Sequence, residues 1–237
     1  MNIKGLQKTT LLDYPGYVAA TVFIGGCNFR CPFCHNMNIV ESCNAEDNNG
    51  RDEISEEELF LFLQKRRGIL DGVCITGGEP TLYKELPEFI GKIKNLGYTI
   101  KLDTNGTNPD MLKNLVKERL IDYVAMDIKA SYVKYMEVAG INDGIKLIDK
   151  VKKSVEYLKS GVIKHEFRTT IVEQYHDEEE IKKIGEILQG EDRYFLQSFK
   201  ESEYVTDKTL TGADKETLEK YVELLKKYIN NPEIRGV

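Results

Sequence analysis

The chain has 237 residues, 41% of them apolar and 30% charged, a balance typical of one well-packed globular domain spanning residues 1–237. The formal net charge of −6 argues against nucleic acid as a partner, because binding to phosphates requires a basic surface. No apolar run reaches the about 18 residues of a membrane span, and residues 1–17 lack the apolar core of a secretory signal. We therefore expect no membrane contact and a cytoplasmic location.

Short apolar runs alternate with amphipathic helical patterns along the chain. The predicted strands cover residues 18–24, 72–75, 98–103, 121–128, 167–172 and 194–199. Helical spacing of apolar residues, with a capping box at Ser55 and Glu58, predicts helices from residue 55 and at 82–96, 109–120, 147–158, 181–188 and about 214–230. The polar stretch 42–52 is expected to form a loop.

This alternation indicates an α/β fold with a mostly parallel sheet, because right-handed crossovers leave few other arrangements. Six strand–helix units are too few for a closed eight-stranded barrel, so an open, curved six-stranded barrel and a doubly wound sheet both fit. In either architecture ligands bind at the carboxyl ends of the strands. We therefore expect the residues directly after each strand to carry the chemistry.

Three of the five cysteines form a C-x3-C-x2-C motif directly after the first predicted strand, within a loop over residues 25–36. Thiolates are the usual ligands of iron–sulfur clusters, and Cys27, Cys31 and Cys34 would leave one iron of a [4Fe–4S] cluster open to a small molecule. The alternative is a structural zinc site with a fourth ligand from His35 or Cys43. A second C-x2-C pair or a pair of histidines, which would complete such a site, is absent from the sequence.

The cysteine motif has an aromatic residue, Phe33, before its last cysteine, and resembles the motif of the radical S-adenosylmethionine superfamily. With Asp-Tyr-Pro-Gly at 13–16 and His-Asn at 35–36, the chain resembles the glycyl-radical-enzyme activating enzymes, and among them the anaerobic ribonucleoside-triphosphate reductase activating proteins. The resemblance implies a partial (β/α)6 barrel. It also implies that S-adenosylmethionine chelates the open iron of the cluster.

In the chemistry that the resemblance implies, one electron cleaves S-adenosylmethionine to a 5′-deoxyadenosyl radical, which removes a hydrogen atom from a glycine of a partner glycyl radical enzyme. Flavodoxin or ferredoxin is the expected electron donor. Two other functions remain open. One is a radical enzyme acting on a small molecule, and the other is a non-catalytic iron–sulfur electron carrier.

The segment after the second predicted strand contains Gly77, Gly78 and Glu79. Two glycines allow the backbone to approach a ligand closely, and Glu79 offers a carboxylate to a cation. The resemblance implies that this segment binds the methionyl amino group, whereas the alternative is a simple turn. It also implies that Phe33 lies near the adenine, for which the alternative is packing within the loop.

Carboxylates end the third and fourth predicted strands, where burial is unfavourable unless a cation or donors are near. The resemblance implies that Asp127 and Lys129 contact S-adenosylmethionine, and that Asp103, Thr104 and Asp127 form a monovalent-cation site beside it. Alternatives are an Asx-turn or helix cap at Asp103 and a plain ion pair between Asp127 and Lys129.

Two residues of the last predicted strands are weaker candidates for binding the cofactor. Arg168 could hold a carboxylate or a ribose, or form a salt bridge between strands. Near Gln197 the sequence has Lys200 where the formate-lyase activases have a histidine. Cys74 is expected in the core and Cys43 as an unpaired thiol in the polar loop.

Overall fold

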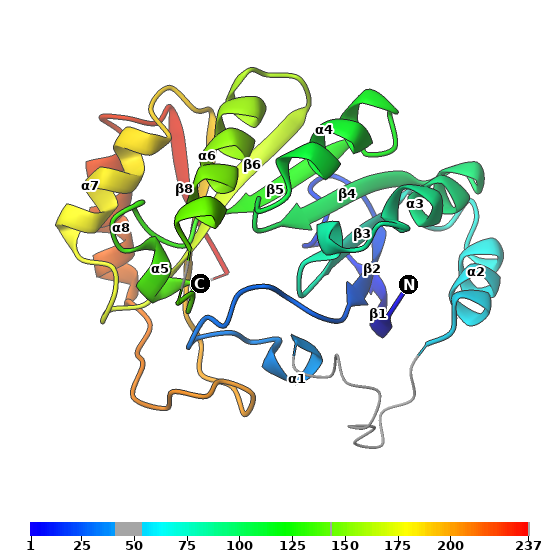
Figure 1. Ribbon diagram of the computed structural model, residues 1–237, viewed down its shortest axis with the longest axis horizontal. Helices are drawn as coiled ribbons and strands as arrows, with labels where there is room; N and C mark the ends of the chain where they lie inside the picture. The colour runs from blue at the N-terminus through cyan, green and yellow to red at the C-terminus, as the bar shows by residue number, and fades with distance from the viewer. Residues whose placement is uncertain (41–53, 143, 237) are drawn as a thin grey trace.

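The computed structural model describes residues 1–40, 54–142 and 144–236, and shows an α/β fold built on one eight-stranded sheet (Figure 1). The strands occur in the sheet in chain order: β1 (Ile3–Thr10), β2 (Ala19–Ile24), β3 (Gly72–Gly77), β4 (Thr99–Thr104), β5 (Tyr123–Asp127), β6 (Lys164–Ile171), β7 (Arg193–Ser198) and β8 (Asn231–Arg235). Only β1 runs antiparallel to its neighbour, and β2 to β8 pair in parallel.

Helices lie on the outer face of the sheet (Figure 1). The longer ones are α2 (Glu56–Lys65), α3 (Leu86–Asn95), α4 (Pro109–Lys117), α6 (Ile145–Lys159), α7 (Glu178–Ile187) and α8 (Lys215–Leu225). Shorter pieces are α1 (Met37–Val40), the 3₁₀ turn η1 (Pro80–Leu82) and α5 (Tyr135–Val138). In the described residues, no helix has the length and hydrophobicity needed to cross a bilayer.

The strand order decides between the two predicted architectures. In a doubly wound sheet the order reverses at a switch point, so that helices cover both faces. Here the order runs from β1 to β8 without reversal, and same-handed crossovers then place the helices on one face. Since β1 and β8 form the two edges, the structure confirms an open α/β sheet with outer helices.

The six predicted strands correspond to β2 to β7, with end points shifted by up to three residues. The prediction missed both edge strands. β1 has exposed polar residues at its centre, and β8 contains Pro232 between polar residues, so neither has the apolar pattern of a buried strand.

The helices of the structure also differ in part from the predicted ones. The capping box of Ser55 and Glu58 starts α2 as expected. The predicted helix at 82–96 divides into η1 and α3, and the predicted C-terminal helix at about 214–230 is limited to α8, where Asp214 is the N-cap. The predicted loop at 42–52 and Cys43 lie outside the described residues.

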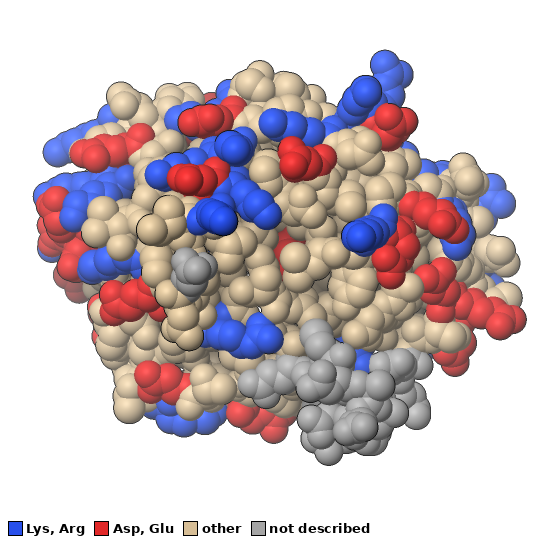
Figure 2. Space-filling model, viewed as in Figure 1, with Lys and Arg blue, Asp and Glu red and all other residues tan. Residues whose placement is uncertain are grey.

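The hydrophobic core lies between the sheet and the outer helices. Side chains of β4 alternate between this core and the inner face, with Ile100 and Leu102 buried among apolar residues and Lys101 ion-paired to Asp103. On the face shown in Figure 2, basic and acidic side chains of the described residues are intermingled and form no continuous basic surface there.

Candidate active site

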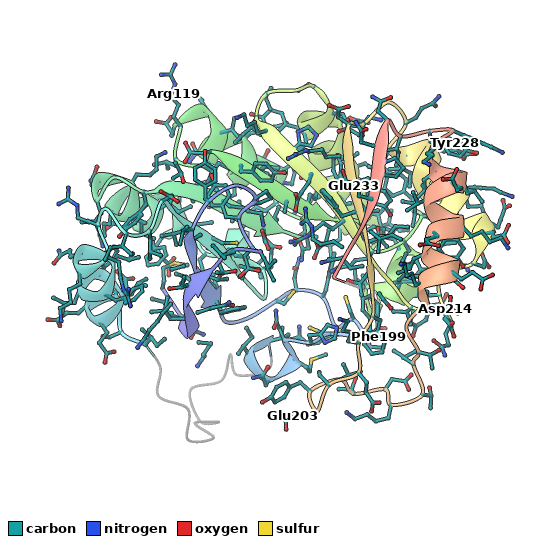
Figure 3. The ribbon with its side chains drawn as sticks, turned by 180° about the vertical axis from the view of Figure 1, so that it is seen from behind. Arg119, Phe199, Glu203, Asp214, Tyr228 and Glu233 are labelled. Atoms are coloured by element: carbon teal, nitrogen blue, oxygen red, sulfur yellow. The ribbon has the colours of Figure 1, made fainter. Side chains whose placement is uncertain are left out.

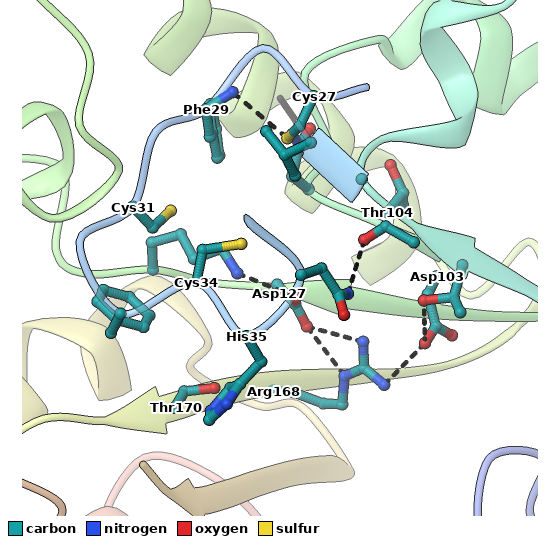
Figure 4. A pocket seen from close by; sticks show the side chains of 18 residues that line it. Cys27, Phe29, Cys31, Cys34, His35, Asp103, Thr104, Asp127, Arg168 and Thr170 are labelled. Atoms are coloured by element: carbon teal, nitrogen blue, oxygen red, sulfur yellow. Dashed lines mark hydrogen bonds and ion pairs between the residues drawn. The ribbon is translucent and has the colours of Figure 1, made fainter. Parts of the chain in front are cut away.

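A cavity of about 200 Å³ lies at the carboxyl ends of the parallel strands, between them and the loop that follows β2 (Figure 4). It is lined by Cys27, Phe29, Cys31, Phe33, Cys34, His35, Asn36, Val40, Thr76, Gly77, Gly78, Asp103, Thr104, Asn105, Asp127, Lys129, Arg168 and Thr170. The cavity therefore brings together residues from the ends of several strands, and their part in the chemistry stays a prediction.

All three cysteines of the motif line this cavity as free thiols. Burial raises the pKa of the Cys27 thiol to about 11 and that of Cys31 to about 12, although the nearby Lys129 ammonium acts in the opposite direction. Burial also raises the pKa of Cys34. The metal-free thiols are therefore protonated at neutral pH, and binding of a metal must displace their protons.

Backbone contacts hold the cysteine loop in place from two sides. The amides of Gly78 and Glu79 donate to the carbonyls of Ile24 and Gly26, each at 2.8 Å. On the other side the amide of Arg30 donates to the carbonyl of Ala139 at 3.0 Å. A Cβ atom on Gly78 would overlap the Gly26 carbonyl, so only glycine allows this approach next to Cys27.

We expect Gly78→Ala to lower the iron content of the reconstituted protein several-fold, because the cysteine loop must shift to make room for the methyl group. The apoprotein should lose about 1–3 kcal/mol of stability, as in other overpacked sites. Iron analysis and urea unfolding measure both effects. The matched control is Gly91→Ala in α3, where the new Cβ would have 3.9 Å to its nearest neighbour. If both variants bind iron equally, the close approach has no role in positioning the loop.

The side chain of Glu79 is placed differently from the expectation. It is fully buried and is not among the residues that line the cavity. Its carboxylate accepts hydrogen bonds from the Thr104 hydroxyl at 2.8 Å, from the Asn105 amide at 2.6 Å and from the Thr81 amide at 3.0 Å. Burial raises its pKa, and these donors oppose the increase. Glu79 therefore joins the loops after β3 and β4 and does not itself face the cavity.

Arg168 lies between Asp103, the last residue but one of β4, and Asp127, which ends β5 (Figure 4). Its Nη1 is 3.1 Å from Asp103 Oδ2, and its Nε and Nη2 are each 2.9 Å from Asp127 Oδ1. The other carboxylate oxygen of Asp103 pairs with Lys101, and the other carboxylate oxygen of Asp127 pairs with Lys129 at 3.0 Å.

This arrangement does not support the predicted monovalent-cation site. All four carboxylate oxygens of Asp103 and Asp127 already pair with side-chain cations, and the Thr104 hydroxyl donates to Glu79. The oxygen atoms expected to surround a cation therefore have other partners, and Arg168 supplies the positive charge between the aspartates.

The ion pairs determine the charges at the cavity wall. Burial by itself would raise the pKa of Asp127, but Arg168 and Lys129 outweigh it and hold this pKa far below its ordinary value. Burial would lower the pKa of Lys129, and Asp127 instead raises it well above normal. At the cavity wall Lys129 and Arg168 thus balance Asp103 and Asp127, and Lys101, which does not line the cavity, adds a third cation behind Asp103.

His176 orients the backbone next to Lys129. It is buried, and its Nε2 lies 2.9 Å from the Lys129 carbonyl. Burial lowers its pKa, so the ring is neutral at physiological pH and can donate this bond.

Three further predictions have different outcomes. Phe33 lines the cavity and packs against the ring of Tyr175 at 6.2 Å, so its contact with an adenine stays a prediction. Gln197 lies in β7 but is not among the cavity-lining residues. Cys74 is fully buried in β3, as expected.

Thr76, Asn105 and Thr170 also line the cavity but were not predicted as site residues. Thr76 directly follows a predicted strand and Asn105 lies two residues after another, so the strand-end rule could have found both, whereas Thr170 lies inside the predicted strand 167–172. The segment from Phe199 to Asp214 also reaches the site (Figure 3): Phe199 contacts the ring of His35 at 5.4 Å, and the Thr206 hydroxyl donates to the Pro32 carbonyl at 3.4 Å.

The donor set of the cavity fits an iron–sulfur cluster better than a single metal ion. Tetrahedral zinc with bonds of about 2.3 Å would bring thiolates to roughly 4 Å from one another. Among the described residues, no three Cys, His, Asp or Glu groups converge in this way. A cubane binds each thiolate to a different iron and so accommodates the wider spacing of three cysteines around one cavity.

Residues 21–188 match the family model of the radical SAM superfamily. The chain is 34% identical, over 99% of its length and 96% of the relative's, to a protein of Methanocaldococcus jannaschii provisionally named a glycyl-radical enzyme activating enzyme.

Solved structures share the fold. SuiB of Streptococcus suis bound to S-adenosylmethionine has a TM-score of 0.67 at 17% identity over 89% of this chain, which spans about half of SuiB (48%). A domain of a pyruvate-formate lyase-activating enzyme from Bacteroides vulgatus has a TM-score of 0.54 at 18% identity, covering 70% of this chain and 99% of that domain. The three-cysteine loop, its place at the open end of the sheet and the match over most of the chain lead to one assignment: the chain belongs to the radical SAM superfamily, in the family of the Methanocaldococcus activating-enzyme relative.

Proposed function

We propose that this enzyme generates a glycyl radical on a partner protein, which we expect to be an anaerobic ribonucleoside-triphosphate reductase. The observation that carries the proposal is the likeness to the Methanocaldococcus relative over nearly the whole of both chains. The Asp-Tyr-Pro-Gly and His-Asn segments on either side of the cysteine motif support an activating enzyme, and the narrower choice of partner rests on the overall resemblance to the ribonucleoside-triphosphate reductase activating proteins.

In this proposal Cys27, Cys31 and Cys34 hold a [4Fe–4S] cluster and the cavity beside them holds S-adenosylmethionine. When bound, the cluster supplies the electron that cleaves S-adenosylmethionine to the 5′-deoxyadenosyl radical. The residues of the chain bind and orient the reactants. The Lys129 ammonium and the Arg168 guanidinium, which both line the cavity, attract the methionyl carboxylate, and Asp127 keeps the Lys129 ammonium in place at 3.0 Å.

The glycines of the β3 end have a second role in the proposal. Because Gly77 and Gly78 lack side chains and line the cavity, a ligand amino group can approach their backbone. In the structure the Gly77 carbonyl accepts a bond from Asn36 Nδ2 at 3.0 Å, which holds the loop after the last cysteine against β3. The proposal also includes flavodoxin or ferredoxin as electron donor and a cytoplasmic location.

The test is to incubate the anaerobically reconstituted, reduced enzyme and S-adenosylmethionine with a candidate ribonucleotide reductase. We expect the doublet of a glycyl radical in the electron paramagnetic resonance spectrum, and no doublet when the partner's glycine is replaced by alanine. If 5′-deoxyadenosine forms but no plausible partner gains the doublet, the activase proposal fails. Turnover of a small metabolite under the same conditions would then favour a radical enzyme with a small-molecule substrate.

A further inference from the structure

Asn28, Thr107 and Asn105 form a closed ring of side-chain hydrogen bonds next to Cys27. Asn28 Nδ2 donates to Thr107 Oγ1 at 2.9 Å, and Thr107 Oγ1 donates to Asn105 Oδ1 at 2.7 Å. Asn105 Nδ2 completes the ring by donating to Asn28 Oδ1 at 2.9 Å. The ring thus joins the loop of the cysteine motif to the loop after β4.

The orientation of the Asn105 amide follows from its backbone partners. Its Oδ1 also accepts a hydrogen bond from the backbone amide of Thr107 at 3.0 Å, and a backbone N–H can only donate. The oxygen must therefore lie on the Thr107 side, and Nδ2 on the side of Asn28. Asn105 and Thr107 are buried, and the Asn105 backbone amide is held by Glu79 at 2.6 Å.

The ring uses one of the two N–H groups of Asn105 Nδ2. The same nitrogen lies 3.8 Å from Cys27 Sγ, within reach of a hydrogen bond to sulfur. The backbone amide of Phe29 approaches the same sulfur at 3.4 Å. Cys27 therefore has a backbone donor and a side-chain donor, and only the side-chain donor can be removed by substitution.

Hydrogen bonds to a cluster thiolate withdraw electron density from it and stabilise the more negative, reduced cluster. We propose that Asn105 is a positioning residue for the cluster, which holds the Cys27 thiolate through its amide and raises the reduction potential of the [4Fe–4S] centre. The inference rests on the proposed function only in requiring that cluster, and not on the identity of any partner.

The test measures the midpoint potential of the anaerobically reconstituted protein by a redox titration followed by electron paramagnetic resonance, with iron and sulfide content determined in parallel. Asn105→Leu keeps the approximate size of the side chain and removes both its N–H donors and its carbonyl acceptor. At equal iron content, we expect the variant to have a more negative midpoint potential than the wild type. At the potential where half of the wild-type cluster is reduced, the reduced fraction of the variant should be several-fold lower.

The matched control is Thr107→Val, which removes the two ring bonds of the Thr107 hydroxyl but leaves both the backbone amide that orients Asn105 and the bond from Asn105 Nδ2 to Asn28. Its potential should stay close to that of the wild type. A second variant, Asn28→Ala, removes the acceptor of Asn105 Nδ2 and should give a smaller shift in the same direction.

An unchanged potential in fully loaded Asn105→Leu would overturn the role of Asn105. If that variant fails to bind iron, an unchanged potential in Asn28→Ala would do the same. A wild-type preparation that contains no [4Fe–4S] cluster would overturn this inference and the proposed function together, whereas a loaded wild type without glycyl radical formation would leave the potential measurement intact.

Discussion

Replacement of Cys31 by alanine is expected to abolish both cluster binding and cleavage of S-adenosylmethionine. Cys31 is the most deeply buried thiol of the motif, and its side chain lines the cavity with Cys27 and Cys34. Two thiolates cannot anchor a cubane that depends on three, because one further iron would lose its protein ligand. Iron and sulfide analysis, and formation of 5′-deoxyadenosine under reducing conditions, should both fall to the level of a control without enzyme.

The control for Cys31→Ala is Cys74→Ala, which removes a thiol that is fully buried in β3 and is not among the cavity-lining residues. This variant should keep its cluster and its activity, with a change in stability of about 1 kcal/mol, the usual size for a single substitution. If Cys31→Ala retained a full cluster, or if the wild type were isolated with one zinc ion, the assignment of the three thiols would be wrong.

The sheet was predictable to the extent that its strands are buried on both faces. Val124, Ala125 and Met126 form a continuous apolar run in β5, which is the usual pattern of a parallel strand between two layers. The edge strands lack that pattern because solvent reaches one side of them. The strand–helix pattern by itself could not decide between an open barrel and a doubly wound sheet, since the answer depends on the order of the strands in space, and only the family resemblance pointed to the barrel.

The site was predictable where it follows from the ends of strands, and not where it depends on partners from distant loops. Asp103 and Asp127 were found because a carboxylate that ends an apolar strand needs a cation. The inward turn of Glu79 depends on donors from Thr104 and Asn105, which the next strand brings close only after folding. The position of Arg168 depends on the register that pairs it with Asp127 across β5 and β6.

Replacement of Arg168 by methionine is expected to lower the free energy of unfolding of the apoprotein by about 3 kcal/mol at neutral pH, because it leaves two partly buried carboxylates without their shared partner. The side chains of Arg168 and Asp103 are only 15% and 13% exposed, so water compensates little for the loss. Lys101 and Lys129 remain, but each reaches only one of the two aspartates. Urea unfolding at pH 7 measures the effect.

The matched control for this variant is Lys220→Met, which removes an ion pair with Glu178 at the surface, where both side chains are largely exposed. It should leave the free energy of unfolding nearly unchanged, since exposed pairs are screened by water and salt. An equally small effect of Arg168→Met would show that the pairs with Asp103 and Asp127 do not stabilise the fold.

The loss caused by Arg168→Met should also depend on pH, with a sign set by the two aspartates. Their pKa values are lowered in the folded wild type, because Arg168 and the lysines outweigh the effect of burial. The wild type therefore gains stability above the ordinary aspartate pKa of about 3.9 and loses it as the pH falls through the lowered values. Without Arg168 burial raises these pKa values again, so the variant carboxyls bind protons at a higher pH. The difference in the free energy of unfolding between wild type and variant should thus be largest near pH 7 and become smaller as the pH is lowered toward 4. A difference that stays constant over this range would mean that Arg168 acts by packing and not through its charge.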